Sequence, residues 1–409
     1  MSAAPRPVAE GDAILGVRPR LALEPASLDE AAEALGALAR DRLAVAFVGG
    51  GTELDLGAPP SRLDAVLHTR RLSKVREHAP SDQIVAVEAG ITLAELQRHL
   101  APHRQRLALD PPEPERATIG GIVAANAFGP RRTRHGSVRD LVIGMTVVRA
   151  DGVVARGGGK VVKNVAGFDV PRLFCGSLGT LGLVAEVVFR LHPLPEASAT
   201  VAFEGLDAAD VAETVPVLRD LGVEPTALAA LPPQGAGRGF TVAVRFEGFA
   251  PGVREQVERT LARAGGGDRV EGADEAALWA RHDAARAAGD VRAKATFGPG
   301  RVADAIEALR PLAATLRGGA LVVHPAIGVA FAAGTLEDAA ATAGAVDAAR
   351  AALARLASGA LVLAAAPAAL RARADPWGPP PPALEVMRRL KAQLDPDGRL
   401  APGRFVGGL

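Results

Sequence analysis

Glycine recurs at every third position in the stretch Gly176-Ser177-Leu178-Gly179-Thr180-Leu181-Gly182. An internal glycine costs a helix or a strand about 0.5–1 kcal/mol relative to alanine, so this spacing is a poor choice for packing alone. The spacing indicates that another group approaches the backbone closely at this point. A second glycine-rich segment precedes it, beginning at Gly157-Gly158-Gly159-Lys160 and running through Lys163 to Asp169.

A third glycine cluster, Gly49-Gly50-Gly51-Thr52, follows the apolar run 44–48, which is typical of a strand that leads into a loop. Consecutive glycines let the backbone curl so that several N–H groups point at one anion, such as a phosphate or a pyrophosphate. Leu54 occupies the third glycine position of a Rossmann fingerprint, and no helix is expected behind it. Gly159-Lys160 is followed by Val161, which excludes the phosphate loop of nucleoside triphosphatases. An ordinary tight turn remains the alternative.

The segment 118–126 combines glycines and small residues with one amide, and it follows the pair Pro111-Pro112. Such a segment can lie flat against a large planar ligand. A local group of positively charged residues follows this segment: Arg131, Arg132, Arg134 and Arg139. By itself such a group is typical of a solvated surface.

These clusters, in this order, resemble the FAD-linked oxidase family of the vanillyl-alcohol oxidase and p-cresol methylhydroxylase (PCMH) type. Within that family the chain is most similar to the FAD-binding subunits of bacterial glycolate oxidase. The resemblance rests on the glycine clusters, on the segment 118–126 and on a terminal motif from Leu394 to Phe405. It covers residues 20–195 and the carboxyl-terminal tail.

The resemblance implies an α+β protein with a two-lobed PCMH-type FAD-binding domain. The pyrophosphate would lie on the loop 49–52, the segment 118–126 beside the isoalloxazine and ribityl chain, and the region 176–184 near the adenine half. The residues expected to bind FAD are Gly49, Gly50, Gly51, Thr52, Pro112, Thr118, Gly120, Gly121, Ala124, Asn126, Arg134, Gly136, Lys163, Gly179, Gly182, Val184 and Arg404.

The FAD is expected to be bound non-covalently. In many relatives a histidine in or beside the first loop is bonded to the flavin, whereas the loop here reads Gly-Gly-Gly-Thr-Glu-Leu from Gly49 to Leu54. It contains neither histidine nor cysteine, and His135 is the nearest alternative point of attachment.

The length, charge and cysteine content of the chain limit its number of domains, its partners and its location. A chain of 409 residues allows two or three domains. Its 47 Lys and Arg against 46 Asp and Glu leave no long-range field for nucleic acid or an anionic membrane. The single cysteine, Cys175, cannot by itself hold an iron–sulfur cluster. The apolar stretches are too short to span a bilayer, and the first twenty residues lack the apolar core of a secretory signal, so a cytoplasmic location is expected.

In the first 195 residues, the sequence predicts helices beginning after Ser27 and Thr92, a strand over 84–87, a hairpin over 141–155 and a strand over 183–191. After Pro195 the predicted elements change to strands that alternate with long helices. This pattern predicts helices on one face of a mainly antiparallel sheet. We expect an FAD-binding domain over 1–195, an α+β cap domain for substrate or partner over 196–375, and a tail over 376–409 that returns to the FAD-binding domain.

Oxidation of a 2-hydroxy acid needs a base for the hydroxyl proton and a cation for the carboxylate. By the resemblance, His324 occupies the strand position where catalytic relatives carry a histidine; a satisfied histidine at a strand end is the alternative. Arg292 and Lys294 alternate on one strand face and could bind a carboxylate, although an exposed face explains them as well. His99 and His103 are spaced like metal ligands, but Pro102 breaks the helix between them, so no metal site is expected.

The resemblance implies an FAD-binding subunit that oxidises glycolate or D-lactate to the 2-oxo acid and passes electrons to a partner. The expected partners are a larger FAD-binding catalytic subunit and an iron–sulfur subunit of the same complex. Two alternatives remain open: a self-sufficient FAD-dependent 2-hydroxy-acid dehydrogenase, and a structural subunit whose flavin fold holds no flavin.

Overall fold

The computed structural model describes residues 5–160, 168–235, 237–264, 266–356 and 359–409. Its contacts divide the chain into two compact units. The first unit comprises Met1–Gly129, Gly136–Leu194 and Pro379–Leu409, and the second comprises Pro130–His135 and Pro195–Gly378. The assignment of Pro130–His135 to the second unit has no signal in the sequence.

One lobe of the first unit is a small parallel sheet in the order β1-β3-β2, formed by β1 (Leu21–Leu23), β2 (Val45–Val48) and β3 (Ala65–His68). Helix α1 (Leu28–Arg40) packs Leu35 and Leu38 into the same core as Leu67. The prediction of this helix is confirmed, and Ser27 caps it by accepting a hydrogen bond from the Glu30 N–H. The Glu30 carboxylate in turn accepts a hydrogen bond from the Ala26 N–H at 2.8 Å.

The other lobe is an antiparallel sheet in the order β4-β5-β9-β7-β8. The predicted strands are confirmed as β5 (Ile84–Glu88) and β9 (Leu183–Arg190), and the predicted hairpin as β7 (Val142–Val148) and β8 (Val154–Gly158). Strand β4 (Val75–Ala79) was not predicted. Its core includes side chains from α2 (Leu93–Leu100), α3 (Ile119–Ala125), α5 (Val138–Leu141) and α6 (Val170–Phe174). A short strand pair, β6 (Gln105–Arg106) with β10 (His192–Pro193), completes this lobe.

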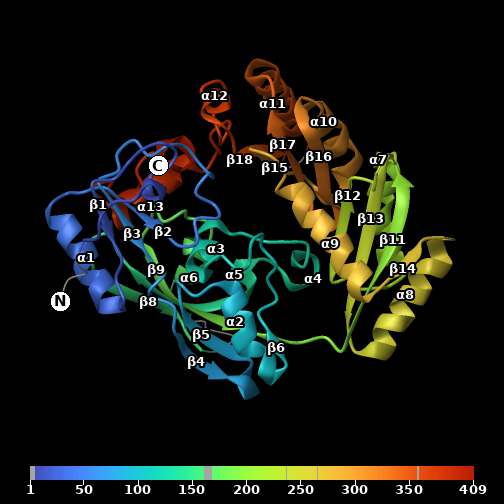
Figure 1. The fold of residues 1–409 in the computed structure, drawn as a ribbon, viewed down its shortest axis with the longest axis horizontal. Coiled ribbons are helices and arrows are strands. Elements are labelled where there is room, and N and C mark those ends of the chain that lie inside the picture. The colour runs from blue at the N-terminus through green and yellow to red at the C-terminus, as the bar shows by residue number, and fades with distance from the viewer. Residues whose placement is uncertain (1–4, 161–167, 236, 265, 357–358) are drawn as a thin grey trace. The chain divides into compact units, whose positions relative to one another are not determined.

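The carboxyl-terminal segment belongs to the first unit. Helix α13 (Leu384–Leu394) is followed by a chain that pairs beside β2: the Val45 N–H donates to the Arg399 carbonyl at 2.9 Å, and the Ala401 N–H donates to the Val45 carbonyl at 2.8 Å. In Figure 1 this red segment lies beside the blue strands β1, β2 and β3. Residues about 350 positions apart in sequence thereby build one lobe.

The second unit is built on one eight-stranded sheet with neighbouring strands antiparallel, in the order β14-β11-β13-β12-β16-β17-β15-β18. The strands are β11 (Ala197–Leu206), β12 (Ala227–Leu231), β13 (Phe240–Gly248), β14 (Asp268–Val270), β15 (Val291–Thr296), β16 (Leu316–His324), β17 (Val329–Leu336) and β18 (Ala360–Ala365). The α+β class predicted for the chain is confirmed.

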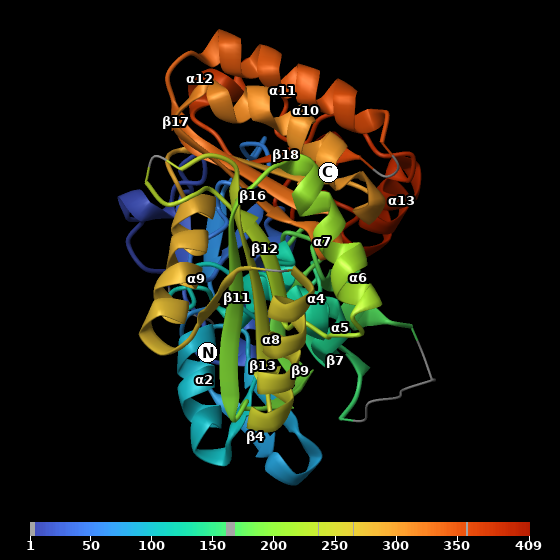
Figure 2. The ribbon, with the colours of Figure 1, turned by 90° about the vertical axis from the view of Figure 1, so that its right-hand side faces the viewer.

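Helices cover both faces of this sheet. One face packs against α7 (Ala208–Asp220), α8 (Ala250–Ala264), α10 (Val302–Ala314) and α11 (Ala339–Ala354); Figure 2 shows α8 in front of β13. The opposite face packs against Leu278 and Trp279 of α9 (Gly272–Arg286). The expectation of helices on a single face is therefore wrong for α9. Two short helices complete the unit, α4 (Arg132–His135) and α12 (Ala368–Arg371).

Candidate functional site

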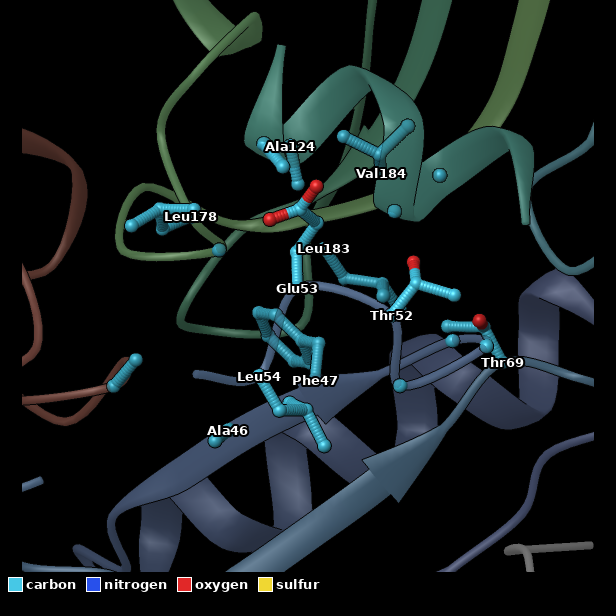
Figure 3. A pocket seen from close by; sticks show the side chains of 18 of the residues that line it. Ala46, Phe47, Thr52, Glu53, Leu54, Thr69, Ala124, Leu178, Leu183 and Val184 are labelled. Atoms are coloured by element: carbon cyan, nitrogen blue, oxygen red, sulfur yellow. The ribbon is translucent and has the colours of Figure 1, made fainter. Parts of the chain in front are cut away.

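The first unit contains a pocket with about 830 Å³ of open space. Its wall combines the end of β2 with its glycine loop, the first turns of α3, the loop before β9 and the carboxyl-terminal tail (Figure 3). The lining residues are Ile14, Ala46, Phe47, Gly49, Gly50, Gly51, Thr52, Glu53, Leu54, Thr69, Gly120, Gly121, Ala124, Ala125, Leu178, Gly179, Gly182, Leu183, Val184, Ala401 and Arg404.

Two glycines of the first loop are required by a close approach of the chain. A Cβ at Gly50 would overlap the carbonyl oxygen of Arg116, and a Cβ at Gly49 would overlap Oγ1 of Thr118. Gly51 has a φ of +77°, a conformation that side chains rarely adopt. The loop is therefore pressed against the segment that leads into α3, with its backbone facing the pocket.

Arg404 holds the chain that follows this loop. Its guanidinium donates hydrogen bonds to the carbonyls of Leu54, Leu56 and Ala58 at 2.9, 2.7 and 3.3 Å. The residue lines the pocket and is only 5 % exposed. A residue of the tail thus fixes the path of the pocket loop from about 350 positions away in sequence.

Two buried polar atoms beside the pocket lack a protein partner among the described residues. They are Oδ1 of Asn126 and Oγ of Ser177, next in sequence to the lining residues Ala125 and Leu178. A buried polar atom without a partner costs about 1–3 kcal/mol. Neither residue lines the pocket itself, but the glycine loop and the apolar wall fit a large ligand with both polar and planar parts, as FAD is.

The structure brings most of the residues expected to bind FAD to this one pocket. Eleven of them line it: Gly49, Gly50, Gly51, Thr52, Gly120, Gly121, Ala124, Gly179, Gly182, Val184 and Arg404. Thr118 lies behind the loop, where it caps α3 and faces Gly49. Pro112, Asn126 and Gly136 are absent from the lining, although Asn126 adjoins it.

Two further expected residues need separate mention. Arg134 belongs to the second unit, where it forms an ion pair with Glu224. His135, the alternative point of flavin attachment, belongs to that unit as well. Lys163 lies outside the described residues.

Sequence reasoning missed several lining residues. Glu53 directly follows the glycine loop, and Figure 3 shows its carboxylate projecting into the space enclosed by the loops. Leu178 directly precedes Gly179, which was expected to bind FAD, and has a φ of 50°, unusual for leucine. Both could have been found as neighbours of a glycine motif. Thr69 and Ile14 come from segments that carry no motif.

In the second unit, the predicted catalytic residues share one face of the sheet. Strand register pairs Lys294 with Phe331, and Phe331 with Val322, two residues before His324. The Phe331 and His324 rings make edge contact, with centroids 5.4 Å apart. Arg292 lies one step farther along β15, opposite Ala333. Lys294 is therefore nearer to His324 than Arg292 is.

Burial controls the titration of two residues considered from the sequence. His324 is fully buried, and desolvation lowers its pKa well below the usual value, with the nearby cations Arg286 and Arg132 acting in the same direction. Burial raises the pKa of the Cys175 thiol to about 12. A thiol with that pKa is protonated at neutral pH and is not a nucleophile.

Among the described residues, no group of three or more His, Cys, Asp or Glu side chains is arranged to hold a metal ion. The His99 and His103 rings both lie beside that of His78, with centroids 5.4 and 4.8 Å from it. In the same part of the chain, every helix is too short or too polar to cross a membrane.

Solved structures with the same fold are distant from this chain in sequence. An alkyldihydroxyacetonephosphate synthase superposes with a TM-score of 0.72 at 18 % identity, covering 95 % of this chain and 78 % of that one. A chitooligosaccharide oxidase superposes with a TM-score of 0.67 at 15 % identity, covering 97 % and 95 %. The predicted combination of a PCMH-type domain and an α+β domain is confirmed.

Each of three curated relatives matches less than half of this chain. Glycolate oxidase subunit GlcD of Bacillus subtilis is 35 % identical over 48 % of this chain and 42 % of its own length. Glycolate oxidase subunit GlcE of Escherichia coli is 34 % identical over 40 % and 47 %. A D-lactate dehydrogenase of Archaeoglobus fulgidus is 34 % identical over 42 % and 38 %. The match thus spans less than half the length of each relative.

The family model of the FAD binding domain matches residues 19–158, which include the glycine loop, α3 and the first strands of both lobes. This region supplies most of the pocket wall, and Ile14, the loop before β9, the start of β9 and the tail supply the rest. The chain therefore contains an FAD binding domain over residues 19–158, and its cofactor is FAD.

Proposed function

We propose that this chain oxidises a small 2-hydroxy acid, glycolate or D-lactate, to the 2-oxo acid with non-covalently bound FAD. The observation that carries the proposal is the set of relatives. Two are subunits of a glycolate oxidase and a third is a D-lactate dehydrogenase, and glycolate and D-lactate are both small 2-hydroxy acids. Bound FAD supplies a two-electron acceptor.

Residues of the second unit would handle the substrate. His324 would accept the hydroxyl proton, and Lys294 would pair with the carboxylate, with Arg292 as a second cation on the same face. Burial lowers the pKa of His324, so the ring is neutral near pH 7 and has a lone pair that can accept a proton.

The chain would act as one subunit of a complex. Its single cysteine cannot ligate an iron–sulfur cluster alone, so electrons leaving the flavin need another carrier. The relatives named as glycolate oxidase subunits support a larger FAD-binding catalytic subunit as one partner. An iron–sulfur subunit is proposed as the next acceptor. The cytoplasmic location expected from the sequence stays a prediction.

The test is the visible spectrum of the chain purified alone, before and after anaerobic addition of glycolate and then of D-lactate. Bleaching of a flavin spectrum supports oxidation by this chain itself, and the His324→Ala variant should then lose bleaching at unchanged FAD content. A flavin spectrum that never bleaches contradicts catalysis by the isolated chain. Restoration of bleaching by co-purified partner subunits would place the substrate site in the complex.

The same experiment addresses the structural alternative. A protein that is colourless as purified and remains colourless after incubation with FAD would contradict FAD as its cofactor. Release of the flavin by acid or heat checks the mode of attachment, since a covalent flavin would stay with the precipitated protein.

A further inference from the structure

His282 of α9 and His324 of β16 form a direct imidazole pair inside the second unit. Their Nε2 atoms are 2.8 Å apart, and neither residue has measurable exposure. The ring planes differ by 20° and the centroids are 5.1 Å apart, a separation that places the rings end to end rather than face to face. The pair is therefore joined by one in-plane N–H···N hydrogen bond.

One hydrogen bond between two neutral imidazoles requires that one Nε2 donates and the other accepts. Two arrangements satisfy this condition. Either His324 carries its proton on Nε2 and leaves Nδ1 bare, or His282 donates and His324 carries its proton on Nδ1. The groups around the two Nδ1 atoms decide between them.

At the His282 end, Nδ1 lies 2.9 Å from Oδ1 of Asp283. A carboxylate accepts hydrogen bonds, so Nδ1 of His282 holds the proton and its Nε2 presents a lone pair. At the other end, Nδ1 of His324 is buried without a partner among the described residues. A proton there would be a buried donor without an acceptor, at a cost of about 1–3 kcal/mol. Both ends favour donation from His324 to His282.

The surrounding charges keep the pair neutral. Arg286 and Arg132 act on His324, and Arg286 and Arg245 act on His282, each lowering the pKa of the ring it faces. Asp283 is the acid that acts in the opposite sense, and its carboxylate is 63 % exposed. An added proton is therefore unfavourable on His324, which faces two arginines. It is more favourable at the other end of the pair, beside the exposed carboxylate of Asp283.

We propose that Asp283 and His282 are positioning residues that hold His324 in its Nε2–H form and carry the proton it receives to solvent. In the step, the substrate must reach Nδ1 of His324 in the interior of the second unit, and this nitrogen then accepts the hydroxyl proton. His324 passes its Nε2 proton to Nε2 of His282, and His282 passes its Nδ1 proton to Asp283 or to water. Each ring gains one proton and loses one. This inference rests on the proposed function for its substrate, but the assignment of the protonated nitrogens does not.

The first measurement is ¹⁵N NMR of the FAD-loaded chain labelled at histidine, with His324 assigned by comparison with His324→Gln. Between about pH 5 and pH 8 we expect an unprotonated Nδ1 and a protonated Nε2 at His324. Asp283→Ala should give mixed protonation at both nitrogens, and Asp283→Glu should restore the original signals. Asp274→Ala, which removes an exposed acid from the same helix, should change nothing. A protonated Nδ1 at His324 in the unaltered chain would overturn the proposal.

The second measurement is turnover with the 2-hydroxy acid. Asp283→Ala should lower kcat about 10-fold or more and leave KM within about twofold, because the substitution alters the proton acceptor and not a substrate contact. The limb of the pH profile that belongs to the base should also shift. Equal kcat in Asp283→Ala and Asp274→Ala would overturn the relay. Absence of turnover in the unaltered chain would instead count against the proposed function, while the NMR result would still decide the positioning.

Discussion

Nζ of Lys391 lies 2.6 Å from Oδ2 of Asp395, and both residues are buried. The ammonium also donates to the carbonyls of Thr180 and Leu400, and the carboxylate accepts from the N–H groups of Arg399 and Leu400. One ion pair thereby connects α13, the loop before β9 and the strand-like tail beside β2. Its position makes the tail a structural part of the FAD pocket.

Replacing Lys391 with methionine should destabilise the first unit. The substitution leaves the Asp395 carboxylate buried and unpaired, which costs about 3–5 kcal/mol. The free energy of unfolding by urea measures this loss. The double variant Lys391→Met/Asp395→Leu should recover part of it, and Arg388→Ala, which breaks an exposed pair on the same helix, should cost less than about 1 kcal/mol. Equal losses for Lys391→Met and Arg388→Ala would contradict this account.

Gly50→Ala should weaken FAD binding at least about tenfold. The added methyl group would overlap the Arg116 carbonyl, so the loop 49–52 must move away from the segment that leads into α3. Flavin content per chain after purification, measured by absorbance, is expected to fall at least about tenfold, as for a loss of about 1.4 kcal/mol or more in binding. Gly344→Ala is the matched control, because it lies in α11 with open space around it and should leave flavin content unchanged. Full flavin content in Gly50→Ala would refute the loop as the cofactor site.

The pocket could be predicted because its signal is local. Glycines at 49–51, 120–121, 179 and 182 are unfavourable for regular structure, and each run pointed to a close approach before any fold was known. The starts of α1 and α2 were predictable because their signal is local as well. Ser27 and Thr92 each accept a hydrogen bond from the backbone N–H three residues later. Strand β12 was not predicted from the sequence, because its residues Ala-Leu-Ala-Ala-Leu are all apolar and show no alternation of polar and apolar side chains.

The pairing of His282 with His324 could not be predicted. The two residues are 42 positions apart, on a helix and a strand that meet only when the sheet forms, and no motif links them. The placement of α9 on the second face of the sheet could not be predicted either, because it too depends on contacts between segments that are distant in sequence. Its Leu278 and Trp279 show that one side is apolar, but not which face of the sheet they cover.

Arg404→Lys should weaken FAD binding although charge is conserved. The guanidinium spans three carbonyls of the segment 54–58, which one ammonium cannot reach with the same geometry. Loss of two hydrogen bonds at about 1 kcal/mol each predicts a rise in the FAD dissociation constant of about 10- to 30-fold, measured by fluorescence titration of the apoprotein. Arg388→Lys is a suitable control on the neighbouring helix, since its side chain is exposed. An unchanged dissociation constant in Arg404→Lys would show that the loop keeps its path without the guanidinium.

Asp12 should make the first unit sensitive to acid. Its carboxylate accepts two hydrogen bonds from Arg6 at 2.6 and 2.9 Å, one from the Ala9 N–H, and lies 2.7 Å from Nε2 of His68. The Arg6 guanidinium, followed by the backbone donor and His68, holds the pKa of Asp12 far below its unfolded value of 3.8. A carboxyl with a depressed folded pKa stabilises the protein above the unfolded pKa, and this contribution is lost as pH falls toward the folded pKa.

Asp12→Asn should therefore be less stable than the unaltered chain at pH 7, by about 1–3 kcal/mol. The difference should shrink as pH falls below about 4, where the unfolded chain begins to gain a proton at Asp12. Urea unfolding at a series of pH values measures it, with Asp151→Asn as the control because that carboxylate is half exposed. A stability difference that stays constant down to pH values well below 3.8 would mean that Asp12 acts through its shape and hydrogen bonds alone, and not through its charge.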